Sequence, residues 1–473
     1  MLEGLLDFFK DKSVIILGFG KEGISTYNFI RKYFPEKRIQ VADKNEKLIE
    51  INPYLKEDKY TELNIGEDYF KDVDRYDIIM KTPGISFKDV DYSKFKDKIF
   101  NQLELIFRYI SCYKIGITGT KGKTTTSSII YKTLVDQGKK ALLLGNIGEP
   151  YFNDLDKMEE DTILVLELSS HALEFVSHSP DIAILLDIFQ EHLDHHNYIE
   201  EYIAAKYNIQ KFQSNKDYFI YNCTNKYMVD FAEKNGIKPK KNDIAIIGNI
   251  DKLDKDDSKK VKEEIINGHY ENFIYCKGSK IFYNDTAVYN KKIKTKLKGD
   301  HNYCNLLFVF AVAKILNLDI DKMVKSMEEF EPIQHRLEFV EEKNGITYYN
   351  DSIATIPEAT MAAIKALKEV DTLIVGGTDR KVDLNEFCKF LRRNKKIRNI
   401  ICMPKTGEYI YDSLKDVKKN LYMVSDVKEA AVLGSKVTEV GKICLMSPAA
   451  ASYGYYKNFE DRGKQFKEAV KNL

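Results

Sequence analysis

The stretch GITGTKGKTTT, residues 116–126, decides the central part of the fold. The short apolar run 114–117 leads into it, and the segment TTTSSIIYKTLVDQ, which has helical spacing, follows it. A glycine-rich turn between a strand and a helix directs successive backbone N–H groups and the helix N-terminus toward one point, which suits an anion. The stretch therefore predicts a strand, a phosphate-binding loop and a helix, in that order.

Individual residues of this loop indicate a triphosphate. Gly119 and Gly122 permit tight turns, Lys123 adds a positive charge, and the hydroxyls of Thr124 and Thr125 suit phosphate or Mg²⁺. The spacing is not that of the common P-loop, whose first glycine would fall on an isoleucine. A plain glycine- and threonine-rich turn explains the glycines, but not the lysine followed by three threonines. We predict ATP binding at Gly119, Thr120, Lys121, Gly122, Lys123, Thr124 and Thr125.

The segments on either side of the loop predict an α/β fold. Apolar runs at 163–166 and 182–186 alternate with helical stretches, which is the pattern of a parallel sheet covered on both faces. Near the N-terminus, SVIIL, GFGKEG and IQVADK form a βαβ opening between residues 13 and 44. After residue 331 the pattern resets, with a helix predicted at 385–393 and a strand at 397–403. We predict three α/β domains: a Rossmann-like domain at 1–108, a central P-loop-type ATPase domain with a parallel sheet at 109–331, and a second Rossmann-like domain at 332–473.

Composition excludes several classes of protein. The 473 residues suffice for several domains, and 73 Lys and Arg against 72 Asp and Glu leave a formal charge of +1, so no global positive field would hold nucleic acid. The seven cysteines form no CxxC pair and are expected to be reduced. The start, MLEGLLDFFKDK, lacks the features of a secretory signal, and no apolar window is long enough for a membrane span. We expect a soluble, cytoplasmic monomer.

Carboxylate and imidazole groups downstream of the loop indicate a metal site. Glu167 follows the strand-like run ILVL, and a carboxylate at the carboxyl end of such a strand is placed to bind Mg²⁺ beside a phosphate loop. His192, in FQEHLDHH, is a candidate ligand for a second metal. His195 and His196 raise the alternative of a zinc site, although no cysteine completes it.

The GFGKEG turn at 18–23 fits a second kind of phosphate site. Asp43 follows Gly18 at the distance typical of a dinucleotide fingerprint, a pattern that is weak by itself. A hydride-transferring enzyme would need support from another domain, and the sequence offers none.

Eight motifs in a fixed order resemble those of the Mur ligases of peptidoglycan synthesis, and most closely those of the D-glutamate-adding members of that family. They are GTKGKTT, ELSSHALE, QEHLDHH, AAK, LKGDHNYCN, HRLE, NDSIAT and SPAAASYGYYKNFEDRG. The resemblance implies ATP-driven amide bond formation between UDP-N-acetylmuramoyl-L-alanine and D-glutamate, through an acyl phosphate. It also implies a role in cell wall formation, cell shape and cell division.

The resemblance assigns roles to particular residues. It implies that Lys206 is carbamylated and that Thr124, Glu167, His192 and Lys206 hold metal, with Lys123, Glu167, His192 and Lys206 as catalytic residues. The UDP-substrate would be bound by Gly18, Phe19, Gly20, Asp43, Thr82, Pro83, Gly84 and Asn146. Further ATP contacts would come from Asn302, Asn305, Arg336 and Asp351. The amino acid would be bound by Ser352, Thr355, Arg380, Lys381, Ser452 and Phe459.

The amino-acid end departs from the family pattern. Ile353 stands where the family usually has a lysine, and an isoleucine cannot pair with a carboxylate, so Arg380 or Lys381 must compensate if glutamate is the substrate. The same chemistry with another amino acid, such as L-glutamate, is one alternative. A regulatory protein that binds nucleotide without turnover is another, although mere binding needs no carbamylated lysine.

Overall fold

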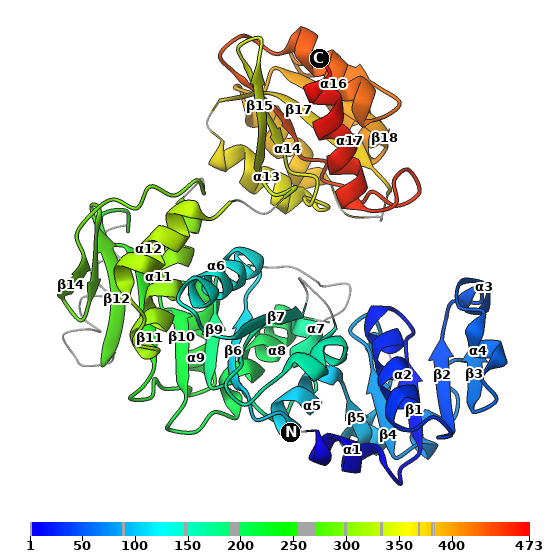
Figure 1. Ribbon diagram of the computed structural model, residues 1–473. Helices are drawn as coiled ribbons and strands as arrows, with labels where there is room; N and C mark the ends of the chain where they lie inside the picture. Colours follow the sequence, from blue (N-terminus) through cyan, green and yellow to red (C-terminus); the bar gives the residue numbers. More distant parts are fainter. Residues whose placement is uncertain are drawn as a thin grey trace. The chain divides into compact units, whose positions relative to one another are not determined.

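The computed structural model describes residues 2–87, 90–145, 150–189, 198–253, 270–297, 300–331, 334–367, 369–379, 382 and 384–473. The chain divides into two compact units, one made of Met1–Lys294 with His301–Phe330 and the other of Thr295–Asp300 with Glu331–Leu473. Each unit consists of sheets flanked by helices (Figure 1), which confirms the predicted α/β class. In the described part of the chain, no helix is long and apolar enough to cross a membrane.

The first unit opens with a five-stranded parallel sheet in the order β3-β2-β1-β4-β5. All four residues of β1, VIIL, are buried, which is typical of a central parallel strand. The GFGKEG turn joins β1 to α2, so the predicted βαβ opening is present. The elements are α1 (Glu3–Phe9), β1 (Val14–Leu17), α2 (Lys21–Tyr33), β2 (Ile39–Asp43), α3 (Leu48–Ile51), α4 (Tyr54–Glu57), β3 (Thr61–Ile65), β4 (Ile78–Lys81), β5 (Ile99–Phe100) and α5 (Gln102–Tyr109).

The same unit contains a nine-stranded sheet in the order β14-β13-β12-β11-β10-β9-β6-β8-β7. Its strands are parallel from β7 across to β12. The chain passes from β8 to β9 across β6, so the carboxyl end of β6 lies at a change of strand order, where α/β sheets usually bind ligands. The elements are β6 (Tyr113–Thr118), α6 (Lys123–Asp136), β7 (Ala141–Gly145), β8 (Ile163–Glu167), α7 (Ser170–Leu173), β9 (Ile182–Leu185), α8 (Ile199–Lys211), β10 (Tyr218–Asn222), α9 (Lys226–Lys234), β11 (Ile244–Asn249), β12 (Asn272–Lys277), α11 (Asp300–Ile315) and α12 (Ile320–Glu329).

An antiparallel hairpin, β13 (Lys280–Tyr283) and β14 (Thr286–Tyr289), extends the edge of this sheet. Its turn residues Asn284 and Asp285 have φ values of 44° and 62°. Two successive left-handed residues are typical of a type I′ turn, whose twist matches that of the two strands. The sequence analysis did not predict this hairpin.

The second unit holds a six-stranded sheet in the order β15-β16-β20-β17-β18-β19. It is parallel except for β15, which runs antiparallel to β16. The helix predicted at 385–393 is confirmed, while the strand predicted at 397–403 lies two residues further on. The elements are β15 (Glu338–Lys343), β16 (Ile346–Asn350), α13 (Pro357–Ala366), β17 (Val370–Gly377), α14 (Asn385–Arg393), β18 (Asn399–Lys405), α15 (Thr406–Leu414), β19 (Asn420–Met423), α16 (Val427–Val437), β20 (Ile443–Met446) and α17 (Phe459–Lys471).

A single hydrophobic cluster runs from the five-stranded sheet into the nine-stranded sheet. The ring centroids of Phe29 and Phe152 lie 4.7 Å apart, and Gln102 donates to the hydroxyl of Thr26 over 2.9 Å. The two sheets therefore form one unit, and the domain boundaries at 108 and 331 stay predictions.

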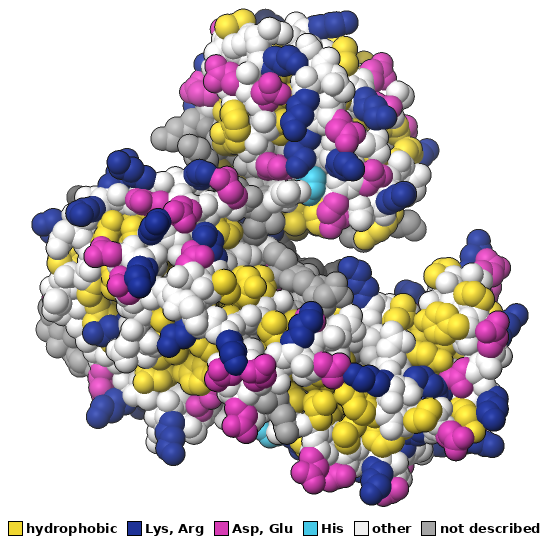
Figure 2. All heavy atoms as spheres, in the orientation of Figure 1, with side chains coloured by type: hydrophobic (Ala, Val, Ile, Leu, Met, Phe, Trp, Pro, Cys, Tyr) yellow, Lys and Arg dark blue, Asp and Glu magenta, His cyan; other side chains and the backbone are white. Residues whose placement is uncertain are grey.

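Acidic and basic side chains are interspersed over the face of the molecule in Figure 2, rather than gathered by sign. This distribution agrees with a formal charge of +1 and with the expectation that charge alone holds no polyanion.

Candidate functional site

The predicted phosphate loop lies between the carboxyl end of β6 and the start of α6, which confirms the predicted order of strand, loop and helix. Gly119 has φ of 150° and Gly122 has φ of 87°, a conformation that favours glycine. A Cβ atom at Gly122 would lie 2.7 Å from Oδ1 of Asn305, so the loop also needs glycine for space. Lys123 donates to the carbonyl oxygens of Gly119 (2.9 Å) and Thr120 (3.1 Å), within the loop itself.

Glu167 lies beside this loop because β8 is the neighbour of β6. The parallel register pairs Ile117 with Glu167, which places the carboxylate at the same edge of the sheet as the loop. The side chain is buried, and its Oε1 accepts a hydrogen bond from the Thr124 hydroxyl over 3.2 Å. Two predicted metal ligands are thus adjacent.

Lys206 reaches the loop from the middle of α8. Its side chain is only 2% exposed, and Nζ donates to the carbonyl oxygen of Gly119 over 2.9 Å and to the Thr118 hydroxyl over 3.3 Å. The ammonium also lies 4.7 Å from the ring centroid of Tyr202, whose hydroxyl is 2.9 Å from that of Thr120. Lys206 is therefore a buried lysine rather than a surface lysine.

The two lysines converge on one atom. Lys123 and Lys206 each donate to the carbonyl oxygen of Gly119 over 2.9 Å, so their nitrogens are less than about 6 Å apart. Two like charges at about 6 Å repel by about 3 kcal/mol at an effective dielectric near 20. The loop therefore holds a concentrated positive charge suited to an anion.

Asn302 and Asn305 of α11 lie on the other side of the loop. Asn305 is buried, its amide approaches Gly122, and its Nδ2 donates to Oδ1 of Asn302 over 3.4 Å. Both predicted ATP-binding asparagines thus belong to the same cluster as the phosphate loop.

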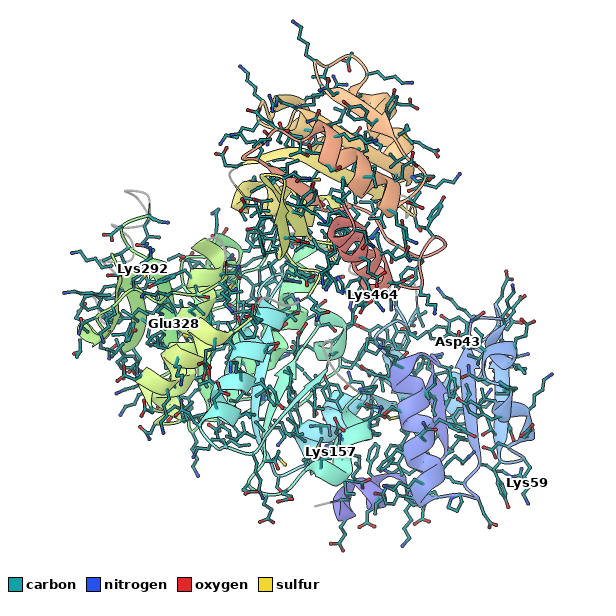
Figure 3. All side chains as sticks on the ribbon, turned by 45° about the horizontal axis from the view of Figure 1, so that its top comes forward. Asp43, Lys59, Lys157, Lys292, Glu328 and Lys464 are labelled. Atoms are coloured by element: carbon teal, nitrogen blue, oxygen red, sulfur yellow. The ribbon has the colours of Figure 1, made fainter. Side chains whose placement is uncertain are left out.

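The predicted UDP-substrate residues other than Asn146 lie at the carboxyl edge of the five-stranded sheet. Asp43 lies at the end of β2, close to the start of α2 (Figure 3). One of its oxygens accepts from the backbone N–H of Phe19 over 2.7 Å and the other from that of Asn45 over 2.8 Å. Gly18 has φ of 91°, and a Cβ there would lie 2.2 Å from the Thr82 hydroxyl. The turn at Pro83 and Gly84 follows Thr82, and a Cβ at Gly20 or Gly84 would meet nothing within 4 Å.

Three charged residues that the sequence analysis missed lie near this edge. Lys81, the last residue of β4, is buried, and its Nζ lies 3.6 Å from Oε2 of Glu174. Burial lowers the pKa of Lys81, while Glu174 and Glu22 oppose that shift. Burial raises the pKa of Glu22, in the first turn of α2, to about 7, and Lys81 opposes it. A lysine ending a strand beside a Thr-Pro-Gly turn was the one signal in the sequence that could have indicated this cluster.

The second unit has a small pocket at the carboxyl ends of β17, β18 and β20, which we call the switch pocket. It is lined by Thr355, Thr378, Asp379, Val382, Leu384, Thr406 and Ala449–Ala451. Thr355 was predicted to bind the amino acid. The hydroxyl of Ser352 is buried and donates to the carbonyl oxygen of Phe459 over 2.7 Å, and Ser452 is also buried. Ser352, Ser452 and Phe459 are not among the residues that line the pocket, whereas Thr355 is.

Arg336 and Asp351 precede and follow the β15–β16 hairpin of the same unit. Within the described residues, the buried Nε of Arg336 has no hydrogen-bond partner. Asp351 is buried and accepts from the backbone N–H of Leu337 over 3.1 Å and from the Ser447 hydroxyl over 2.7 Å.

Four predicted site residues lie outside the described residues: Asn146, His192, Arg380 and Lys381. The alternative zinc site at His192, His195 and His196 lies outside them as well. Among the residues that are described, no group of three or more His, Cys, Asp and Glu side chains forms a metal site.

A phosphate loop at a change of strand order, with a buried carboxylate and lysine beside it, defines a nucleotide-binding α/β protein. Residues 117–313 match the Mur ligase middle domain, and residues 335–450 match the Mur ligase glutamate ligase domain. The UDP-N-acetylmuramoylalanine–D-glutamate ligase of Clostridium kluyveri is 34% identical over 98% of each chain. That of Clostridium botulinum is 33% identical over 99% of this chain and 98% of its own. The chain belongs to the Mur ligase family.

Solved structures share the fold at low identity. The UDP-N-acetylmuramate–alanine ligase MurC of Thermotoga maritima is 19% identical with a TM-score of 0.55, over 98% of this chain and 99% of that one. The MurF ligase of the same organism, solved with ADP, is 15% identical with a TM-score of 0.55, over 92% and 96%. The similarity to these structures extends across both units, so each unit has a fold seen in these ligases.

Proposed function

We propose that this chain is a cytoplasmic ATP-dependent ligase that joins D-glutamate to UDP-N-acetylmuramoyl-L-alanine in peptidoglycan precursor synthesis. The observation that carries the proposal is that Lys123 and Lys206 both donate to the Gly119 carbonyl oxygen while Thr124, next in the loop, donates to Glu167. The similarity to D-glutamate ligases over nearly the whole chain supports the choice of substrates.

The residues present fit a magnesium-bound triphosphate. The loop requires glycine at position 122, both for its φ and because a side chain would fill the space in front of Asn305. Lys123 would hold the phosphates, and Thr124 and Glu167 would hold Mg²⁺ through hard oxygen atoms. When bound, Mg²⁺ supplies neutralisation of the charge on the transferring phosphoryl group.

Carbamylation of Lys206 would remove an electrostatic conflict in the cluster. As an ammonium, Lys206 repels Lys123 and any nearby Mg²⁺, whereas a carbamate would be attracted to both. Its burial also shields a carbamate from water. This proposal accounts for a lysine that is 2% exposed next to a second cation.

The UDP-substrate and the amino acid would bind at the carboxyl edges of two different sheets. Gly20 and the start of α2 would face the pyrophosphate, because the α2 N-terminus is open, and Asp43 would accept a hydrogen bond from the uridine. The amino acid would enter the switch pocket past Thr355. Arg336, whose Nε has no hydrogen-bond partner among the described residues, would donate to ATP.

Release of ADP tests the proposal. The intact chain, Mg²⁺, ATP and UDP-N-acetylmuramoyl-L-alanine are combined with a panel of D- and L-amino acids, with each component omitted in turn as a control. We expect ADP with D-glutamate and much less with L-glutamate. Turnover with another amino acid alone would overturn the D-glutamate assignment, and no turnover with any of them would favour a regulatory protein.

A further inference from the structure

Among the described residues, Arg462 is the largest side chain that is fully buried. It is 0% exposed and lies in the first turn of α17, which Asn458 caps by accepting from the backbone N–H of Asp461 over 2.8 Å. A buried arginine is normally paired with a carboxylate, because an uncompensated charge in the interior is costly.

The guanidinium is instead bonded only to neutral oxygen atoms. Nε donates to the Ser352 hydroxyl (3.0 Å) and Nη2 to the Ser352 carbonyl oxygen (2.8 Å). Nη1 donates to the carbonyl oxygens of Ala450 (3.1 Å) and Ala451 (3.4 Å). Among the described residues, no carboxylate forms an ion pair with it. Burial lowers the pKa of Arg462 to about 10, which still leaves it charged at neutral pH.

These bonds tie together the segments around the switch pocket. Ala450 and Ala451 line the pocket directly, and the carbonyl oxygen of Ala451 also accepts from the backbone N–H of Thr378 over 2.8 Å. Gly377 has φ of 149°, and a Cβ there would lie 3.0 Å from Nη1 of Arg462. The guanidinium therefore holds the lining segment Ala450–Ala451 directly, and the Ala451 carbonyl oxygen links it to the lining residue Thr378.

One buried side chain thus holds Ser352 together with Ala450 and Ala451. We propose that Arg462 is the positioning residue of the switch pocket: its guanidinium holds the backbone of Ala450 and Ala451 in the shape that the incoming amino acid requires. This inference rests on the proposed function, since it names the amino acid as the ligand of the pocket.

Steady-state kinetics of the full chain test this inference. The KM values for D-glutamate, ATP and UDP-N-acetylmuramoyl-L-alanine are measured for the native chain, Arg462→Met and Arg462→Lys. We expect Arg462→Met to raise the KM for D-glutamate about 10- to 100-fold and the other two KM values less than about threefold. Arg462→Lys, which keeps the charge but loses the planar fork, should raise the D-glutamate KM by less.

Arg31→Met is the matched control. Arg31 is a mostly buried arginine of the other unit, paired with Asp58 and remote from the switch pocket in sequence and unit. Its loss should lower the melting temperature without raising the KM for D-glutamate. A purely structural Arg462 would behave in the same way, which would overturn the inference.

The variants separate this inference from the proposed function. If the native chain releases no ADP with any amino acid, the proposed function fails. If the native chain is active and Arg462→Met leaves the D-glutamate KM unchanged, only the role of Arg462 fails. If Arg462→Met does not fold, Arg462→Lys decides, because an unchanged D-glutamate KM in that variant overturns the positioning role.

Discussion

Replacement of Gly122 by alanine isolates the steric demand of the phosphate loop. The native φ of 87° disfavours any L-residue by about 1–2 kcal/mol. The added Cβ would lie 2.7 Å from Oδ1 of the buried Asn305, so the asparagine must move away from Asn302. Loss of that hydrogen bond costs about 1 kcal/mol more. We expect a total destabilisation of about 2–3 kcal/mol.

Gly138→Ala is the matched control for this prediction. Gly138 follows the same helix at its other end, has φ of 75°, and a Cβ there would meet nothing within 4 Å. Gly138→Ala introduces the same backbone strain without a steric contact. It should therefore lower the free energy of unfolding by about 1–2 kcal/mol and leave ATP binding unchanged.

Thermal unfolding and ATP titration calorimetry measure the two effects. Gly122→Ala should melt below Gly138→Ala and bind ATP about tenfold more weakly, because Asn305 and the loop amides move together. The double variant Gly122→Ala with Asn305→Ala should be more stable than the sum of the single changes predicts. The reasoning would be refuted if Gly122→Ala melted at the same temperature as Gly138→Ala and bound ATP as tightly as the native chain.

Three further predictions concern single charged residues. Lys206→Ala should abolish most ADP release, with partial rescue by added formate or acetate if a carbamate acts there; near-native turnover would exclude that role. Lys123→Ala should lose ATP-dependent turnover while calorimetric binding of the UDP-substrate survives, and intact turnover would mean that the phosphate site lies elsewhere. Glu22 has its pKa raised from 4.5 to about 7, mainly by burial, so the folded chain binds an extra proton between those values and its stability falls as pH rises through them. Glu22→Gln should therefore raise the free energy of unfolding by on the order of 1–3 kcal/mol above pH 7 and have little effect near pH 4.5. Denaturant unfolding at the two pH values measures the effect. A stability difference between variant and native chain that does not change with pH would contradict this prediction.

The sheets were predictable where apolar runs meet glycine turns. The β1 and β6 strands are short buried runs followed by turns at Gly18 and Gly119, and both were predicted from that pattern. The hairpin β13–β14 was not, because its strands are short and of mixed polarity and its turn is Asn284–Asp285 without a glycine. Pairing of such edge strands depends on the sheet already present beside them.

The nucleotide end of the site was more predictable than its surroundings. Glu167 was placed correctly beside the loop because the carboxyl ends of neighbouring parallel strands meet at one edge. Lys81 and Arg462 were missed, since a long charged side chain normally indicates a surface, and only tertiary packing buries these two. That Ser352 binds the amino acid stays a prediction, and the bonds of its hydroxyl to Arg462 and Phe459 join distant segments, which spacing does not reveal.

A crystal structure of the full chain with Mg²⁺ and a non-hydrolysable ATP analogue tests the central claim most directly. We predict the triphosphate on the loop between Gly119 and Thr124, with Mg²⁺ in contact with Glu167 and extra density on Nζ of Lys206. A nucleotide bound elsewhere, or a metal that does not touch Glu167, would contradict the account.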